Sequence, residues 1–324
     1  MDGSGASPLP GRSWPWKLFT GEVLSAVRQP GAFEEGSSFV EARMMTEGGA
    51  GRATPPSVAD DGEGGESRAG GRGSLLPAPF ARFLLQMGRF VDMLGRVFAW
   101  TPRPPYDWRE LSRQMVKVGV SSTPVVLLTA LFTGMVLALQ TFTVLKRFNA
   151  ESYVGSLVGL SMVRELAAVL SSLIVAGRAG SAMGAELGTM RVTEQIDALE
   201  VMATDPVHYL VVPRVWATVL MMPLLVALAD GIGIFGGYLV SVVLMGSNPV
   251  SYLNTSFQFM NLNDLMSGLI KAAVFGLLLA TIGCQQGFYT TGGAEGVGRS
   301  TTAAVVLASI AILAADFFLT KLLF

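Results

Sequence analysis

Charged residues inside the long apolar runs are the side chains of this sequence that point most directly to chemistry. A charge at the centre of a bilayer costs at least about 2.5–3.5 kcal/mol on insertion scales, so each is expected to be paired or functional. The adjacent Arg164 and Glu165 point about 100° apart on a helix, so they need different partners, and we expect at least one to face a cavity. For part of the charged residues in these runs, a purely structural ion pair is the alternative to a functional role. We expect a buried charge network that contains Arg178, Glu186, Asp230, Lys271 and Asp316.

The residues that metal sites and hydrolases need are scarce. The chain has one histidine, His208, and one cysteine, Cys284, which leaves no plausible zinc cluster and excludes a disulfide scaffold. We therefore expect no metal site and no cofactor. An intramembrane hydrolase would have to use His208, which lies at the edge of an apolar run beside Pro206, and this enzyme class is kept as an alternative.

Residues 293–300, GAEGVGRS, imitate the P-loop pattern GxxxxGK[ST], with Arg299 in the place of the lysine. A P-loop follows a β-strand and opens a helix, with its lysine on the phosphates. This segment joins two apolar runs instead. The sequence therefore predicts no ATPase activity of its own.

The composition indicates a membrane protein. Of the 324 residues, 51% are hydrophobic and 15% are charged, whereas soluble domains carry about 25% charged residues. The net charge of −1 excludes a nucleic-acid binder, which would need a basic excess. Because the apolar residues gather into runs after about residue 117, we predict an all-α polytopic membrane protein.

Five apolar runs are long enough to cross a bilayer, which takes about 20 residues. The second and third exceed that length and are expected to tilt, break or project, and Pro124 and Pro223 are expected kink sites. The predicted permease domain covers 117–324, with spans at about 118–145, 155–189, 207–245, 264–288 and 300–323.

The N-terminal third differs from the spans. Residues 1–75 are rich in Gly, Ser, Pro and acids, which predicts a disordered low-complexity tail. Residues 76–116 are predicted to hold an amphipathic helix and a linker. A helix lying in the headgroup layer fits this pattern better than a soluble core helix. Its apolar face would carry Phe83, Met87, Phe90, Leu94 and Val97, and another face Arg82, Arg89 and Arg96.

Basic residues set the expected orientation. They precede the first span, whereas the 246–263 loop has none, so the positive-inside rule places the N-terminus in the cytoplasm and the C-terminus outside. The polar segment 190–206 is then cytoplasmic. We predict that Thr193 caps a short helix there. Its apolar face would contain Ile196, Leu199, Val201 and Met202, and on spacing alone it could dock a soluble motor or lie along the headgroups.

Gly180, Gly184 and Gly188 form a stripe of small residues that would let two helices approach closely. Packing within one subunit and self-association both fit this stripe.

Residues 163–214 carry a resemblance to a known family. They read VRELAAVLSSLIVAGRAGSAMGAELGTMRVTEQIDALEVMATDPVHYLVVPR and resemble the MlaE (YrbE) permeases, the membrane subunits of ABC transporters that work with MCE-domain proteins. The likeness runs from about 78 to 324, through FTGMVLALQ (132–140), GIFGG (233–237), LIKAAVFG (269–276) and DFFLTKLLF (316–324).

The resemblance implies a homodimer of five-span permeases with an interfacial helix, cytoplasmic ATPase subunits and a periplasmic MCE protein. It implies a coupling helix at 190–203 that meets the ATPase through Glu194, Gln195, Asp197 and Leu199. It also implies a phospholipid cavity at the dimer interface, lined by Leu137, Gln140, Val144, Leu145 and Phe148, with Arg164 and Glu165 nearby. Members often carry RELGP where this chain has RELAA at 164–168, which predicts a straighter second span.

These implications add up to a bacterial inner-membrane permease, not itself catalytic, that moves phospholipid between the inner and outer membranes. Its motor would be a separate ATPase. A motor-independent lipid carrier or channel and the intramembrane hydrolase are the alternatives.

Overall fold

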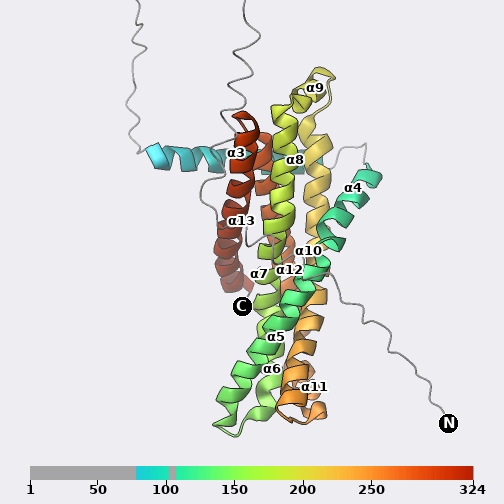
Figure 1. Ribbon diagram of the computed structural model, residues 1–324, viewed down its shortest axis with the longest axis vertical. Helices are drawn as coiled ribbons and strands as arrows, with labels where there is room; N and C mark the ends of the chain where they lie inside the picture. Colours follow the sequence, from blue (N-terminus) through green and yellow to red (C-terminus); the bar gives the residue numbers. More distant parts are fainter. Residues whose placement is uncertain (1–77, 102–106, 324) are drawn as a thin grey trace, which may run out of the picture. The chain divides into compact units, whose positions relative to one another are not determined.

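The computed structural model describes residues 78–101 and 107–323, and side chains from residue 84 onward. In this part of the chain every regular element is a helix, which confirms the all-α prediction (Figure 1). The predicted tail at 1–75, residues 102–106 of the predicted helix-and-linker segment at 76–116, and the side chains of Arg82 and Phe83 lie outside the described residues.

Five helical segments are long and apolar enough to cross a membrane, as predicted. They are Trp108–Lys146, Glu151–Val192, Val207–Leu244, Leu262–Phe288 and Gly293–Leu323. The first, second and third contain short π-helical or 3-10 segments, so each is made of several elements.

The first span contains α4 (Trp108–Met115), η1 (Val116–Val120) and α5 (Thr123–Lys146); the second contains η2 (Glu151–Tyr153), α6 (Val154–Ser161), η3 (Met162–Leu166), α7 (Ala167–Val175), η4 (Ala176–Gly180) and α8 (Ser181–Val192). The third contains η5 (Val207–Val211), α10 (Val212–Tyr238) and η6 (Leu239–Leu244). The fourth and fifth are α12 (Leu262–Phe288) and α13 (Gly293–Leu323). The helices outside the spans are α3 (Ala78–Trp100), α9 (Gln195–Val201) and α11 (Pro249–Gln258).

Side-chain caps fix where several helices begin. The Asp107 carboxylate accepts hydrogen bonds from the backbone N–H groups of Arg109 and Glu110, both at 3.1 Å, and so starts α4. Asn261 and Asp264 form a reciprocal capping box at the start of α12. These caps satisfy backbone donors that the first helical turn leaves open.

The two proline sites behave differently. Pro124 lies in the first turn of α5, directly after the turn that ends η1, so it marks a boundary between two helices. Pro223 lies inside α10, which continues through it from Val212 to Tyr238 as one α-helix. In the second span, residues 162–166 are wound as a π-helix, η3, which overlaps the RELAA sequence at 164–168; the straighter course expected there stays a prediction.

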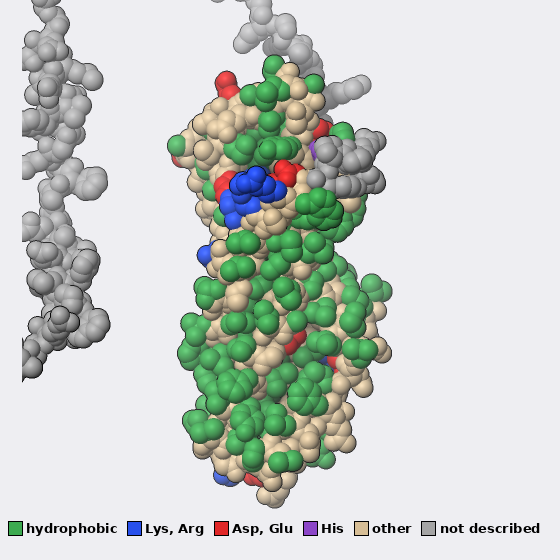
Figure 2. Space-filling model, turned by 90° about the vertical axis from the view of Figure 1, so that its right-hand side faces the viewer, with side chains coloured by type: hydrophobic (Ala, Val, Ile, Leu, Met, Phe, Trp, Pro, Cys, Tyr) green, Lys and Arg blue, Asp and Glu red, His purple; other side chains and the backbone are tan. Residues whose placement is uncertain are grey.

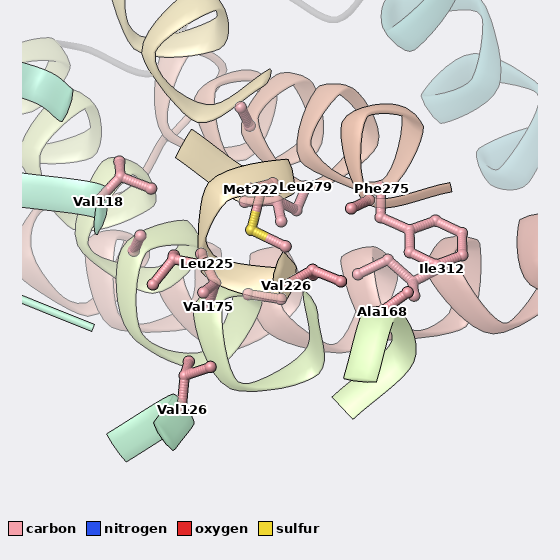
Figure 3. Packing of buried hydrophobic residues seen from close by; sticks show 14 of the residues in the cluster. Val118, Val126, Ala168, Val175, Met222, Leu225, Val226, Phe275, Leu279 and Ile312 are labelled. Carbon is pink, nitrogen blue, oxygen red and sulfur yellow. The ribbon is translucent and has the colours of Figure 1, made fainter. Parts of the chain in front are cut away.

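Helix α10 packs between α5 and α12 and forms the middle of the core. Figure 3 shows Met222, Leu225 and Val226 of α10 among side chains of α7 and α12. The α5 and α10 backbones also meet directly, because a Cβ atom on Gly134 would lie only 1.9 Å from the Gly233 carbonyl oxygen. Glycine is therefore required where these two helices cross.

Helices α3 and α9 lie at one end of the bundle and α11 lies at the other (Figure 1); we call them the α9 end and the α11 end. Helix α3 crosses the bundle rather than following the spans. It is attached to α12, because the Gln285 side chain donates to the Gln86 carbonyl at 3.0 Å and Arg89 lies over the Tyr289 ring at 4.9 Å. Met93 and Val97, which belong to α3 itself, are buried.

The outer surface of the spans is apolar. Figure 2 shows the side on which α4 lies in Figure 1: hydrophobic side chains cover most of it toward the α11 end, and charged side chains gather toward the α9 end. Large apolar side chains are exposed along α5 and α13; they include Leu128, Phe132, Val136, Val306, Ile310, Leu313 and Phe317. These two helices therefore offer the largest apolar faces to lipid or to another protein chain.

Candidate functional site

A cluster of charged and polar residues joins η3, α12 and α13; we call it the central cluster, and its members are Arg164, Glu165, Asp264, Lys271, Asp316 and Thr320. The fully buried Lys271 is its centre. Its ammonium nitrogen lies 2.7 Å from the Glu165 carboxylate, 3.3 Å from the Asp316 carboxylate and 2.7 Å from the Thr320 hydroxyl. One buried cation thus holds two carboxylates that are 151 residues apart in sequence (316 − 165).

Arg164 and Glu165 serve different partners, as their adjacent positions on a helix require. The Arg164 guanidinium binds the buried Asp264 carboxylate, with Nη2–Oδ1 at 2.6 Å and Nε–Oδ1 at 2.8 Å. The other Asp264 oxygen accepts the Asn261 backbone N–H at 3.0 Å. Asp264 therefore anchors η3 and caps α12 at the same time.

An open cavity of about 610 Å³ lies beside the central cluster, between the second span and α13. Glu165, Asp316, Thr320 and Lys321 give it a polar end. Its remaining walls are the apolar side chains of Leu166, Val169, Leu170, Leu313 and Phe317. This combination suits a molecule with an apolar body and a polar or charged end.

A second group of charges lies toward the α9 end and is centred on Glu186. One of its carboxylate oxygens lies 2.7 Å from the Lys117 ammonium, and the other lies 3.2 Å from the Arg214 guanidinium. Arg214 is buried and also donates to the Leu210 carbonyl at 3.0 Å. These contacts tie the first, second and third spans together.

The structure does not bring the five residues of the predicted buried network together. Lys271 and Asp316 meet in the central cluster, whereas Glu186 belongs to the separate group with Lys117 and Arg214. Asp230 is buried on α10, and neither of its carboxylate oxygens has a hydrogen-bond partner among the described residues. Arg178 is exposed on η4 rather than buried.

Of the five residues that the resemblance implied as lipid contacts, Leu137, Gln140, Val144 and Leu145 lie on the half of α5 nearer the α11 end, and Phe148 follows the end of that helix. Leu137 and Leu145 are partly buried against the core. Gln140, Val144 and Phe148 are exposed. None of these five side chains lines the 610 Å³ cavity of the single chain.

The segment 190–203 is a helix end, a tight turn and a short helix rather than one helix. Helix α8 continues to Val192, and the Thr193 hydroxyl donates to the Thr189 carbonyl at 2.9 Å, so Thr193 ends α8 instead of starting α9. Glu194 adopts a left-handed backbone conformation, with φ of 58°, and reverses the chain into α9. Local backbone preference does not explain this conformation, because a non-glycine residue in the left-handed region needs support from tertiary contacts.

Helix α9 packs through fewer residues than predicted. Ile196 is buried and Leu199 is partly buried. Val201 and Met202 are 88% and 66% exposed, so the prediction that they share the packed face is wrong. Of the polar residues, Asp197 forms an ion pair with Arg191, whereas Glu194 and Gln195 are exposed.

A larger cavity, of about 940 Å³, lies near α9 and contains His208 on its wall. The His208 ring lies 5.1 Å from the Trp100 ring, and the nearby Thr101 hydroxyl accepts a hydrogen bond from the Trp216 indole at 2.9 Å. No serine lines this cavity in the described part of the chain. The Ser–His arrangement that a hydrolase would use is therefore not assembled there.

The two remaining sequence motifs are structural elements of the bundle. Residues 293–300 form the first turns of α13, with Arg299 lying 3.7 Å from Glu295, so the P-loop imitation is helical. In the glycine stripe, Cβ atoms on Gly184 and Gly188 would meet atoms of α12, α13 and Thr290. These two glycines therefore serve packing within the chain.

Comparison with known proteins decides the family. The family "Permease MlaE" matches residues 111–322. The chain belongs to the MlaE permease family. It is 40% identical over 252 residues to the intermembrane phospholipid transport system permease protein MlaE of Haemophilus influenzae, a match that covers 78% of this chain and 97% of that protein.

Two other relatives show how widely the MlaE permease family is spread. A probable ABC transporter permease protein of Rickettsia typhi is 49% identical over 222 residues, covering 68% of this chain and 86% of that protein. The chloroplastic protein TRIGALACTOSYLDIACYLGLYCEROL 1 of Arabidopsis thaliana is 39% identical over 230 residues, covering 71% of this chain and 66% of that protein. This MlaE-family chain is thus a multi-pass membrane protein, and its Haemophilus and Rickettsia relatives are named as permeases.

Four residues were not predicted from the sequence as members of a charge cluster: Lys117, Arg214, Asp264 and Thr320. Asp264 follows Asn261 by three residues at the start of an apolar run, which is the spacing of a capping box. That signal could have identified the helix start, but not the ion pair with Arg164. Arg214 and Lys117 lie at the ends of apolar runs, where a basic residue is ordinarily an interfacial one.

Proposed function

We propose that this chain is the membrane subunit of an ABC transporter that moves phospholipid between two membranes, driven by a separate ATPase. The names of the Haemophilus and Rickettsia relatives, which refer to intermembrane phospholipid transport and to ABC transport, support this proposal. The P-loop imitation is helical, which supports the proposal that nucleotide is hydrolysed by a different protein.

The cavity beside the central cluster is the observation that carries the proposal. A phospholipid has acyl chains that favour apolar walls and a headgroup that favours charged or hydrogen-bonding groups. The cavity offers Val169, Leu170 and Leu313 for the chains, and Glu165, Asp316 and Lys321 at its polar end. The buried Lys271 holds both acids in place and restrains their side chains.

Homodimerisation completes the lipid site in this proposal. The 610 Å³ cavity is walled by the second span and α13 and is open to the outside of the single chain. The exposed apolar faces of α5 and α13 fit a second copy. In such a dimer Leu137, Gln140, Val144, Leu145 and Phe148 line the same lipid path as Arg164 and Glu165.

The α9 end faces the cytoplasm in this proposal. Arg109, Arg113 and Lys117 lie at the start of the first span, and such basic residues favour the cytoplasmic side. The turn at Glu194 and the exposed Gln195 then form the contact for the ATPase, with Asp197 held by Arg191 and Leu199 packed beneath. Helix α3, with its exposed Arg89 and Arg96, lies in the cytoplasmic headgroup layer.

Helix α9 leads through Pro206 directly into η5 and α10, the helix at the middle of the core. A push on α9 is therefore transmitted to α10, and from α10 to α5 and α12, against which it packs. Closure of the ATPase would then compress the lipid cavity and transfer the lipid to an MCE-domain protein at the α11 end.

Purification of the tagged chain in nanodiscs, followed by mass spectrometry of bound proteins and lipids, tests the proposal. Recovery of an ATPase, an MCE-domain protein and phospholipid is the expected result. Lipid movement in proteoliposomes that contain this chain without an ATPase would favour the motor-independent carrier instead. A lipid-free chain with no protein partner would overturn the proposal.

A further inference from the structure

Asp230 is a buried carboxyl group that neither the lipid site nor the ATPase contact uses. It lies on α10, one turn before Gly233, and it is 5% exposed. No N–H or O–H group of the described residues reaches either of its oxygen atoms. The carboxyl group therefore receives no hydrogen bond in the part of the chain that the structure describes.

The nearby cations are paired with other carboxylates. On the elements that pack against α10, Arg164 binds Asp264, and Lys271 binds Glu165 and Asp316. Lys117 and the buried Arg214 bind Glu186. The other charged or titratable groups described on these elements are Arg89, Asp92, Arg96, Arg109, Glu110, Arg113, Lys146, His208, Tyr209, Tyr238, Tyr252 and Cys284, and no ion pair joins any of them to Asp230.

The backbone of a helix bundle offers a buried side chain hydrogen-bond acceptors more readily than donors. Backbone N–H groups inside a helix are used by the helix itself, whereas each carbonyl oxygen can accept a second hydrogen bond. Hydroxyl groups in these spans use this second site: Thr218 donates to the Arg214 carbonyl at 2.8 Å and Ser172 donates to the Ala168 carbonyl at 2.6 Å. A protonated Asp230 could donate in the same way, but an ionised Asp230 could only accept.

Burial disfavours the ionised form for a second reason. An ionised carboxylate without a cation or a donor is strongly penalised in a medium of low dielectric, and such groups take up a proton instead. The residues at neighbouring positions of the same helix face, Val226 and Gly233, are apolar and fully packed. Both arguments favour the protonated, neutral form of the Asp230 carboxyl group.

We propose that Asp230 is a proton-binding site in the membrane-embedded core, and that its carboxyl group carries a proton in this conformation. Loss of this proton requires α10 to separate from its neighbours far enough to admit water or a cation. This proposal does not depend on the proposed cargo or motor, so either proposal can fail without affecting the other.

Infrared spectroscopy of the full-length chain in nanodiscs at neutral pH tests this proton directly. A protonated carboxyl group has a C=O stretching band that is distinct from the bands of a carboxylate and shifts in D₂O. The expected result is a band that is lost in D230N and kept in D264N. Asp264 is the matched control, because it is equally buried but is paired with Arg164. A spectrum that D230N leaves unchanged overturns the proposal.

Thermal unfolding provides the second measurement. Asn resembles the neutral acid in shape, so D230N is expected to fold with a nearly unchanged unfolding temperature at neutral pH. D264N is expected to unfold at a lower temperature, because it leaves Arg164 facing an uncharged group. A D230N chain that fails to fold, or that loses more stability than D264N, would show that the Asp230 charge is needed and would contradict the proposal.

Discussion

The Lys271 ammonium lies 2.7 Å from the carboxylate of Glu165, a residue 106 positions earlier in the chain. Lys271 is fully buried, while the Glu165 side chain keeps 35% of its surface exposed toward the cavity. The pair therefore connects the interior of the bundle to the surface where a ligand would enter. Its integrity determines how the acidic end of the cavity is arranged.

Removing the cation should destabilise the fold. In K271M, Glu165 and Asp316 lose their shared partner, and we expect the free energy of unfolding to fall by about 2–4 kcal/mol, less than for a completely buried pair because Glu165 is partly exposed. Denaturant unfolding in detergent measures this loss. The triple variant K271M/E165Q/D316N should recover part of it, and equal stability of the single and triple variants would argue against the pairing.

The crossing of α5 and α10 should not tolerate a methyl group. In G134A the new Cβ atom would lie 1.9 Å from the Gly233 carbonyl oxygen, and neither backbone can rotate away. We expect a loss of about 1–3 kcal/mol or more. G231A, on the same helix as Gly233, is the control because its Cβ atom would meet nothing within 4 Å. It should change stability by no more than about 1 kcal/mol, and similar losses in both variants would refute the close crossing.

Filling the cavity should displace lipid. Leu313 lines the cavity, so L313W is expected to reduce the phospholipid that co-purifies with the chain by about tenfold, which corresponds to 1.4 kcal/mol of binding free energy. Quantitative lipid mass spectrometry is the measurement. Ile310 lies on the same helix and is 59% exposed but does not line the cavity, so I310W should retain the lipid. Equal lipid content in L313W and wild type would place the lipid elsewhere.

The turn before α9 should tolerate glycine and not a reversed charge. Glu194 has a left-handed backbone, which glycine adopts without strain, so E194G should fold at least as well as the wild type. E194R keeps a side chain but reverses its charge, and we expect it to lose the ATPase in a pull-down while keeping its bound lipid. An E194R chain that still recovers the ATPase would exclude Glu194 from the contact.

The number and order of the spans could be predicted from the sequence because length and hydropathy alone determine them. The partners of the buried charges could not. Glu165 and Lys271 are 106 residues apart, and only the packing of η3 against α12 brings them together. Sequence analysis recognised that Arg164 and Glu165 need different partners, but it grouped Glu186 with Lys271, although each belongs to a different cluster.

Local signals around 190–203 were also ambiguous in physical terms. Threonine can cap the start of a helix or bond back to a carbonyl of the preceding turn, and Thr193 does the second. The choice depends on the left-handed backbone of Glu194, a conformation that a glutamate does not favour by itself. Tertiary packing of Ile196 supplies what the local sequence lacks.

The π-helical segments η3 and η4 have a consequence for insertions and deletions. A π turn holds one more residue than an α turn, so η3 and η4 each take up one extra residue while α6 and α8 keep their rotation relative to α7. This phase lets α6 face α11 while α8 faces α12 and α13. Deleting one residue within 162–166 would convert η3 to α-helix and keep α6 in nearly the same rotation relative to α7, whereas deleting one residue inside α7 would turn α6 by about 100° relative to α8.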